Sequence, residues 1–293
     1  MTSLLRLAGC IRTSLLAILM VAFMPLSQAT ETGLLWKMES QDGNTSYLFG
    51  TMHSDDRRVT DLPPAVMQAL LNSDVFLMET LPQPNPAIFL MENHRLDHLL
   101  TEQEFVQVIK LADFHSMHTD IATLMKPWLL AVVFDLPKPQ TPYTQDAMLM
   151  SLAQGKSKTI RGLETTEEHF GVLDSFTLDE QLVMLRAVLK RSAKDKERNF
   201  ESLVAAYRSG NPEKIEKLND KITGSILPKD LWARMRTKLL DERNVLMAER
   251  IAEQAKQSNL FVAVGASHLA GKTGLIARLR EAGYQLTPVN AAQ

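Results

Sequence analysis

The feature that most constrains the fold is a pattern repeated at the two ends of the chain. Near the N-terminus, "SYLFGTMH" is followed by "LPPAVMQALLNSDVFLMET". Near the C-terminus, "NLFVAVGASH" is followed by "TGLIARLREAGYQLTPV". Each copy reads as a strand, a Gly-x-x-His motif, a short loop, a helix and a second strand. Such a βαβ-like unit places its motif at the carboxyl end of a strand, where open α/β sheets bind ligands. The sequence therefore predicts a ligand site built by both ends of the chain.

The middle of the chain has a different pattern. Helical segments dominate from about residue 85 to 257, and a strand near 158–165 interrupts them. Long charged amphipathic helices are predicted over roughly 177–208 and 228–257. Before the first repeat, "LLWKME" and "SYLFG" flank an Asp-Gly turn and predict a hairpin. We therefore predict an α/β (α+β) fold: a mixed sheet from two related strand–GxxH–helix–strand halves, with a helical insertion between them.

The first 29 residues read as a secretory signal peptide. Arg6 and Arg12 form a positively charged region, ten apolar residues follow from Leu15 to Met24, and "SQA" offers a cleavage site after Ala29. An uncleaved anchor is the alternative, but a bilayer span needs about 20 apolar residues. We therefore predict export to the periplasm or secretion, one mature domain over residues 30–293, and no stable membrane span after cleavage.

Composition and spacing disfavour several classes of function. Cys10, the only cysteine, lies in the predicted signal peptide, so the mature chain has no disulfide, thiolate metal site or cysteine nucleophile. Loss of Arg6 and Arg12 reduces 32 basic residues to 30 against 34 acids, a net charge of −4, and no basic stripe suggests nucleic-acid binding. A phosphate loop is disfavoured because five residues, not four, separate Gly265 from Gly271.

Four polar side chains stand at the ends of four predicted strands: His53, Glu79, Glu164 and His268. Two imidazoles with one or two carboxylates suit a divalent metal with an open coordination position, which acidifies a bound water. A second carboxylate would act as general base or orient a ligand histidine. The alternative is that these residues cap helices or form buried ion pairs. His169 has no evident partner in the sequence.

Several segments resemble the TraB/GumN family, which includes the animal Tiki proteins. They are "YLFGTMH", "DVFLMET", "GLET", "LLDERNVLMAERI" and "FVAVGASHLAGKTGLIARLREAGY", and the resemblance spans about residues 34–289. It implies one active site formed by two Gly-x-x-His motifs and conserved acids. Tiki proteins are described as metal-dependent proteases that favour manganese or cobalt, and zinc is a further candidate here. The family is also distantly similar to the haem-binding ChaN and erythromycin-esterase group.

Carried over onto this chain, the resemblance implies that His53, Glu79 and His268 bind the metal, with Glu164 and Arg243 as catalytic companions. For Arg243 the sequence alone favours a solvated partner of a residue one helical turn away. As a functional residue, its guanidinium would clamp a substrate carboxylate or stabilise an oxyanion.

We therefore expect an exported metal-dependent hydrolase that acts on peptide bonds, with a peptide or protein as its substrate. Two other functions stay open from the sequence. The first is a periplasmic protein that binds a peptide or haem without cleaving it. The second is an esterase that uses a histidine base and no metal.

Overall fold

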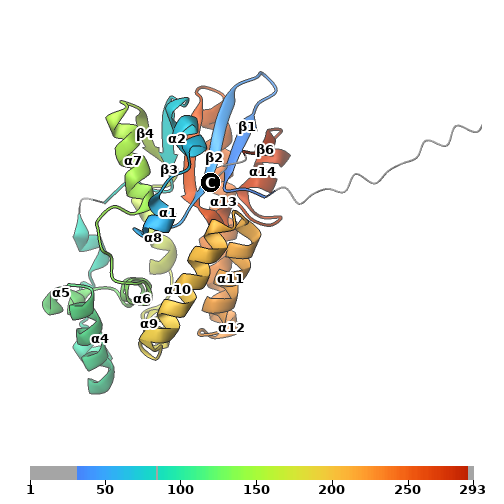
Figure 1. Cartoon of the computed structure of the whole chain (residues 1–293). Coiled ribbons are helices and arrows are strands. Elements are labelled where there is room, and N and C mark those ends of the chain that lie inside the picture. Colours follow the sequence, from blue (N-terminus) through green and yellow to red (C-terminus); the bar gives the residue numbers. More distant parts are fainter. Residues whose placement is uncertain (1–31, 84, 290–293) are drawn as a thin grey trace, which may run out of the picture. The chain divides into compact units, whose positions relative to one another are not determined.

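The computed structural model describes residues 32–83 and 85–289 (Figure 1). The predicted signal peptide lies outside these residues. Within the described part of the chain, no helix has the length and apolar character needed to cross a membrane.

A six-stranded mixed sheet forms the centre of the described fold, which confirms the predicted class. Four neighbouring strands run parallel, and the remaining two pair antiparallel with their neighbours at one edge. Across the sheet the order is β4 (Thr159–Gly162), β3 (Val75–Met78), β5 (Leu260–Gly265), β2 (Thr45–Thr51), β1 (Leu35–Glu39) and β6 (Gln285–Pro288). The predicted hairpin is β1–β2, and its Asp-Gly turn places Gly43 at a φ of 86°, which suits glycine.

The two repeated units wind in opposite directions from the centre of the sheet. β2 leads through α2 (Pro64–Leu71) to β3, and β5 leads through α14 (Leu275–Glu281) to β6. α2 packs with α7 (Gln145–Gly155) on one face, whereas α14 packs with α13 (Arg243–Ala255) on the other. Adjacent strands β2 and β5 therefore form a topological switch point, whose carboxyl ends are the usual ligand site of such sheets.

Burial explains why β5 reads as a continuous apolar run. Its side chains alternate between the two packed faces: Leu260, Val262 and Val264 contact the α13–α14 layer, and Phe261 and Ala263 contact the α2–α7 layer. A strand covered on both faces needs apolar residues at every position.

The helical middle segment is divided more finely than predicted. The region 177–208 contains two helices, because Ser192 caps a new helix by accepting from the backbone N–H of Asp195. The region 228–257 is a continuous helix with a π-helical segment, η2 (Thr237–Glu242), in its middle. The predicted strand at 158–165 is shorter, Thr159–Gly162. The remaining short and long helices are α1 (Arg57–Thr60), η1 (Pro86–Phe89), α3 (Leu96–Leu99), α4 (Glu102–Phe114), α5 (Thr119–Leu124), α6 (Pro127–Asp135), α8 (Thr166–Asp174), α9 (Leu178–Leu189), α10 (Ala193–Arg208), α11 (Pro212–Gly224), α12 (Lys229–Arg236) and η3 (Ala266–His268).

This helical segment has a hydrophobic core of its own. Trp128 and Phe134 of α6 pack with Leu185 of α9 and Met235 of α12, away from the core beside the sheet. The continuous helix formed by α12, η2 and α13 therefore contributes to two cores, through α12 to the helical one and through α13 to the sheet.

Gly50 of the first Gly-x-x-His motif is required by close packing against the second motif. A Cβ atom there would lie 2.7 Å from Leu269 Cδ1 and 3.0 Å from Ala266 Cα. We expect Gly50→Ala to lower the free energy of unfolding by about 1–3 kcal/mol, the usual effect of overpacking a core. Urea denaturation measures this change.

Gly171→Ala is the matched control. Gly171 lies within α8, and a Cβ there would meet nothing within 4 Å. Alanine in a helix should therefore raise stability by about 0.5–1 kcal/mol. Equal effects of the two substitutions would show that the two motifs do not depend on this close approach.

Candidate active site

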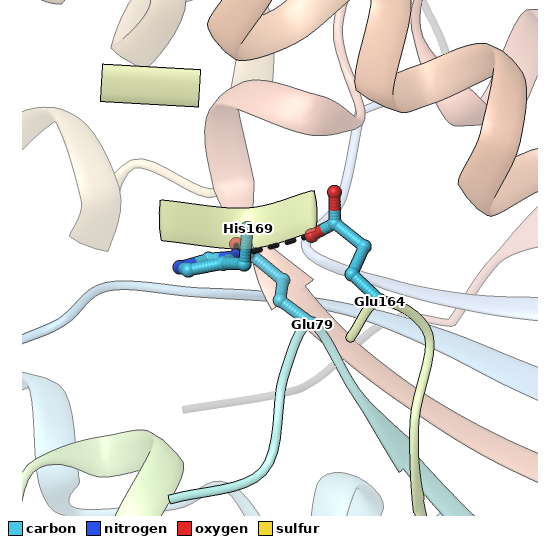
Figure 2. Close-up of side chains that lie close together, drawn as sticks. All are labelled: Glu79, Glu164 and His169. Carbon is cyan, nitrogen blue, oxygen red and sulfur yellow. Dashed lines mark hydrogen bonds and ion pairs between the residues drawn. The ribbon is translucent and has the colours of Figure 1, made fainter. Parts of the chain in front are cut away.

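The candidate site lies at the carboxyl ends of the parallel strands. Glu79 follows the last residue of β3, Glu164 follows β4 by two residues, and His268 ends the short helix η3 after β5. The segments that follow β3 and β4 stay hydrogen-bonded to each other. Leu163 N–H donates to Met78 O and Glu164 N–H donates to Glu79 O, both at 2.8 Å. The two acids are therefore brought side by side by strand pairing (Figure 2).

Arg243, the first residue of α13, connects the two acids. Its Nε donates to Glu164 Oε1 at 2.8 Å, and its Nη2 lies 2.6 Å from both Glu164 Oε2 and Glu79 Oε2. Only 10% of the Arg243 side chain is exposed. The solvated helix-surface role that the sequence favoured for Arg243 is therefore wrong: its partners are 79 and 164 residues away along the chain.

The charges in this cluster stabilise one another. Burial opposes the ionisation of both acids. The Arg243 guanidinium nevertheless holds the pKa of Glu164 below its ordinary value, and the positive charges of His268, when protonated in acid, and of Arg243 do the same for the pKa of Glu79. The Gly265 N–H also donates to Glu79 Oε1 at 2.7 Å. Conversely, burial lowers the pKa of Arg243, but the two carboxylates more than offset it and raise that pKa. Both acids are thus ionised at neutral pH.

His268 is buried beside Glu79 as a neutral imidazole. Burial lowers its pKa to about 4. Its Nδ1 contacts Asn244 Oδ1 at 2.7 Å, and the amide nitrogen of Asn244 donates to Thr273 O at 3.0 Å. An amide oxygen can only accept, so the proton of His268 is on Nδ1. Its Nε2 lone pair lies 3.7 Å from Glu79 Oε1.

His53, the histidine of the first motif, is not part of this cluster. Its side chain is 74% exposed, and its Nδ1 lies 3.3 Å from Asp146 Oδ2 at the start of α7. The hydrogen bond to Asp146 raises the pKa of His53, and Glu79 adds a smaller contribution through space. The structure therefore brings together Glu79, Glu164, Arg243 and His268, while His53 faces solvent on the neighbouring motif.

His169 is a site residue that the sequence did not reveal. It lies in the first turns of α8, with Nδ1 3.1 Å from Glu164 Oε2 and 3.8 Å from Glu79 Oε2 (Figure 2). The prediction that His169 lacks a partner is wrong. The one available signal was its position, because the strand end at Glu164 is followed at once by the Thr165 cap of α8.

The protonation of His169 follows from its neighbours. Arg243 Nη2 is 3.0 Å from His169 Nδ1, but its two protons are directed more closely, at 2.6 Å, to the two carboxylates. Nδ1 of His169 is therefore the donor to Glu164.

Two sets of potential metal-ligand atoms lie close together beside Arg243. Glu79, Glu164 and His169 offer atoms within 4.8 Å of one another, but Arg243 Nη2 already lies within 3.0 Å of all three. The guanidinium thus fills that position. Glu79 Oε1 and His268 Nε2 lie 3.7 Å apart, and Arg243 Nη1 lies 3.4 Å from the same His268 nitrogen. The oxygen and nitrogen chemistry of this second set suits manganese, cobalt or zinc.

A separate cavity of about 1010 Å³ lies beside α1 and α2, and a second of about 810 Å³ lies between α9 and α10. Neither is lined by Glu79, Glu164, Arg243 or His268. We place the chemistry at the charged cluster, because ionised acids, a buried cation and a neutral imidazole converge there.

Comparison with known proteins agrees with the sequence motifs. The family model described as TraB/PrgY/gumN matches residues 34–288. A search of curated proteins finds no match.

Proposed function

Because the chain belongs to the TraB/PrgY/gumN family, we propose that it is an exported, metal-dependent hydrolase that cleaves peptide bonds. One observation supports the proposal: Nε2 of neutral His268 lies 3.7 Å from ionised Glu79 in a buried site. A neutral imidazole nitrogen and a carboxylate oxygen this close together are suited to bind one metal ion.

In this proposal Glu79 Oε1 and His268 Nε2 hold the metal, and His53 Nε2 supplies a third ligand from the neighbouring motif. Manganese or cobalt is favoured by the family resemblance, with zinc as a further candidate. When bound, the metal would polarise the scissile carbonyl and lower the pKa of water.

Glu164 is suited to holding other groups and poorly suited to taking a proton. Both of its oxygens already bond to Arg243, and one of them also accepts from His169. The proton-transfer role passes instead to His169, whose Nδ1 is held by Glu164 and whose side chain is 21% exposed. Glu164 would then orient His169, as a carboxylate orients a catalytic imidazole.

Arg243 is suited to stabilising negative charge. Its Nε and Nη2 are committed to the two acids, so it has no free pair of N–H groups to clamp a substrate carboxylate. Nη1 makes only two longer contacts, 3.2 Å to Leu239 O and 3.4 Å to His268 Nε2. This nitrogen would donate to the oxyanion that forms during hydrolysis.

The His169–Glu164 pair also supports a second candidate, a metal-free hydrolase. An imidazole oriented by an ionised carboxylate is the arrangement that histidine bases use in esterases. The two candidates differ in one property: only the first needs a divalent cation.

The test uses the protein from Thr30 onward. Elemental mass spectrometry after loading with manganese, cobalt or zinc measures metal content, and a peptide library with and without chelator measures cleavage. We expect near-stoichiometric metal and chelator-sensitive cleavage, with both lost in His53→Ala. Metal retained by His53→Ala would contradict its ligand role.

The other outcomes select the alternatives. Cleavage that survives chelation would favour the metal-free histidine base. Saturable peptide binding without turnover, or a Soret band on haem titration, would replace hydrolysis with ligand capture.

A further inference from the structure

The two motif histidines are anchored through the same ring nitrogen. Asp146 Oδ2 lies 3.3 Å from His53 Nδ1, and Asn244 Oδ1 lies 2.7 Å from His268 Nδ1. Neither anchor belongs to the repeated strand–helix–strand units. Both come from the helical segment between them, so the match is not a simple result of the repeat.

The anchors also occupy equivalent places in that segment. Asp146 is the second residue of α7, which precedes β4, and Asn244 is the second residue of α13, which precedes β5. In each case the first residue of the helix also makes a hydrogen bond at the site. Gln145 accepts from Met52 N–H at 3.0 Å, and Arg243 binds the two acids.

Each anchor can only accept at the oxygen that faces its histidine. The Asp146 carboxylate, which also accepts from Thr51 Oγ1 at 2.7 Å, has no proton to give when ionised. The Asn244 amide nitrogen is committed to Thr273 O, so its oxygen faces His268. In the neutral form of both histidines the proton therefore lies on Nδ1 and the lone pair on Nε2.

We infer that Asp146 and Asn244 are positioning residues that hold His53 and His268 in the Nδ1–H tautomer, so that both present Nε2 to one shared ligand. Metal-binding histidines are commonly oriented in this way by an oxygen on the other ring nitrogen. The tautomer itself is independent of the proposed function, whereas the identity of the shared ligand as a metal rests on it.

Burial explains why one anchor is an acid and the other an amide. The Asp146 side chain is 19% exposed, so solvent screens its charge. Asn244 is 2% exposed and lies beside a site that already contains Glu79 and Glu164. An amide supplies the same acceptor there without a third buried negative charge.

Nitrogen NMR of the protein with ¹⁵N-labelled histidine, at alkaline pH, reads the tautomers directly. We expect His53, His169 and His268 all to be protonated at Nδ1. In Asp146→Ala only His53 should lose this fixed tautomer, while His169, anchored by Glu164, stays as an internal reference. A wild-type His53 or His268 protonated at Nε2 would overturn the inference without any variant.

Titration with Mn²⁺ gives the second readout. Loss of such an anchor typically weakens metal binding by about 10–100-fold. We expect this weakening in Asp146→Ala and Asn244→Ala, and recovery in Asp146→Asn, whose amide oxygen still accepts. Asp113→Ala is the control, because Asp113 is an exposed residue of α4.

The two proposals fail in different ways. Wild-type protein with the expected tautomers but no Mn²⁺ binding would refute the metal site and leave the positioning roles intact. Mn²⁺ binding that is equal in wild type and in Asp146→Ala, with His53 still protonated at Nδ1, would refute the positioning role of Asp146 and leave the metal site.

Discussion

Arg243→Ala should lower the free energy of unfolding by about 3–5 kcal/mol, the usual cost of removing one partner from a buried ion pair. The substitution leaves two ionised acids, Glu79 and Glu164, facing each other without the cation that lies 2.6 Å from both. Urea denaturation at neutral pH measures the change. Arg250→Ala on the same helix is the control. Arg250 bonds Glu168 and the Leu163 carbonyl oxygen, the Arg250 and Glu168 side chains are both 35% exposed, and a solvent-screened pair contributes about 0–1 kcal/mol.

Divalent metal should restore part of the stability of Arg243→Ala. Without the guanidinium, the atoms of Glu79, Glu164 and His169 that lie within 4.8 Å of one another become available to a cation. We therefore expect Mn²⁺ or Zn²⁺ to raise the unfolding midpoint of Arg243→Ala more than that of Arg250→Ala. Loss of stability below about 1 kcal/mol, without metal rescue, would mean that the acids do not depend on Arg243.

Glu79→Gln should abolish metal binding and reduce peptide hydrolysis by at least about 100-fold, since one residue supplies both a metal ligand and charge to the site. Glu79 contacts Arg243, His268 and the Gly265 N–H. The amide oxygen of glutamine still accepts from Gly265, and Glu164 still holds Arg243 through two bonds, so the fold should remain. Metal content and cleavage rate are the measurements.

Glu167→Gln is the matched control for this second prediction. Glu167 lies in α8 near the site but is exposed, so its substitution should leave metal content and cleavage unchanged. Full metal content in Glu79→Gln would remove Glu79 from the proposed ligand set. Equal loss in both variants would point to a general effect of charge.

The sequence predicted the parts of the site that depend on strand ends. Apolar runs marked β3 and β5, and "KTIRGLET" predicted the strand that contains β4. Parallel strands bring their carboxyl ends to one edge of a sheet. Glu79, Glu164 and His268 were therefore recognisable from local patterns alone. The mixed sheet and the family were predicted and are confirmed.

The parts that depend on helix packing were not predictable from local patterns. Arg243 and Asn244 read as ordinary polar positions of an amphipathic helix, because nothing nearby in the sequence reveals partners 79 and 24 residues away. His169 was missed although its hydrogen-bond partner, Glu164, is only five residues away. The turn that connects Glu164 to α8 brings His169 back toward Glu164 and Glu79, and the local sequence pattern does not reveal that turn.

His53 shows that equal motifs can have different backbones. In the register of the sheet, Thr51 of β2 pairs with Gly265 of β5, so the two glycines are offset by one residue. After Gly265 the chain forms the helix η3, whereas after Thr51 it forms a bend in which Ser54 N–H donates to Met52 O. The tetrapeptide alone therefore did not determine where its histidine points.

The π-helical segment η2 connects a helix that packs in the helical core to a helix that packs against the sheet. On its N-terminal side α12 is fixed by the helical core through Leu231 and Met235, and on its C-terminal side α13 is fixed by the sheet through Met247 and Ile251. A regular helix would lock the angular phase of both ends together at about 100° per residue. The wider turn changes that phase immediately before Arg243, so α12 can face the helical core while the Arg243 guanidinium faces the acids at the sheet edge.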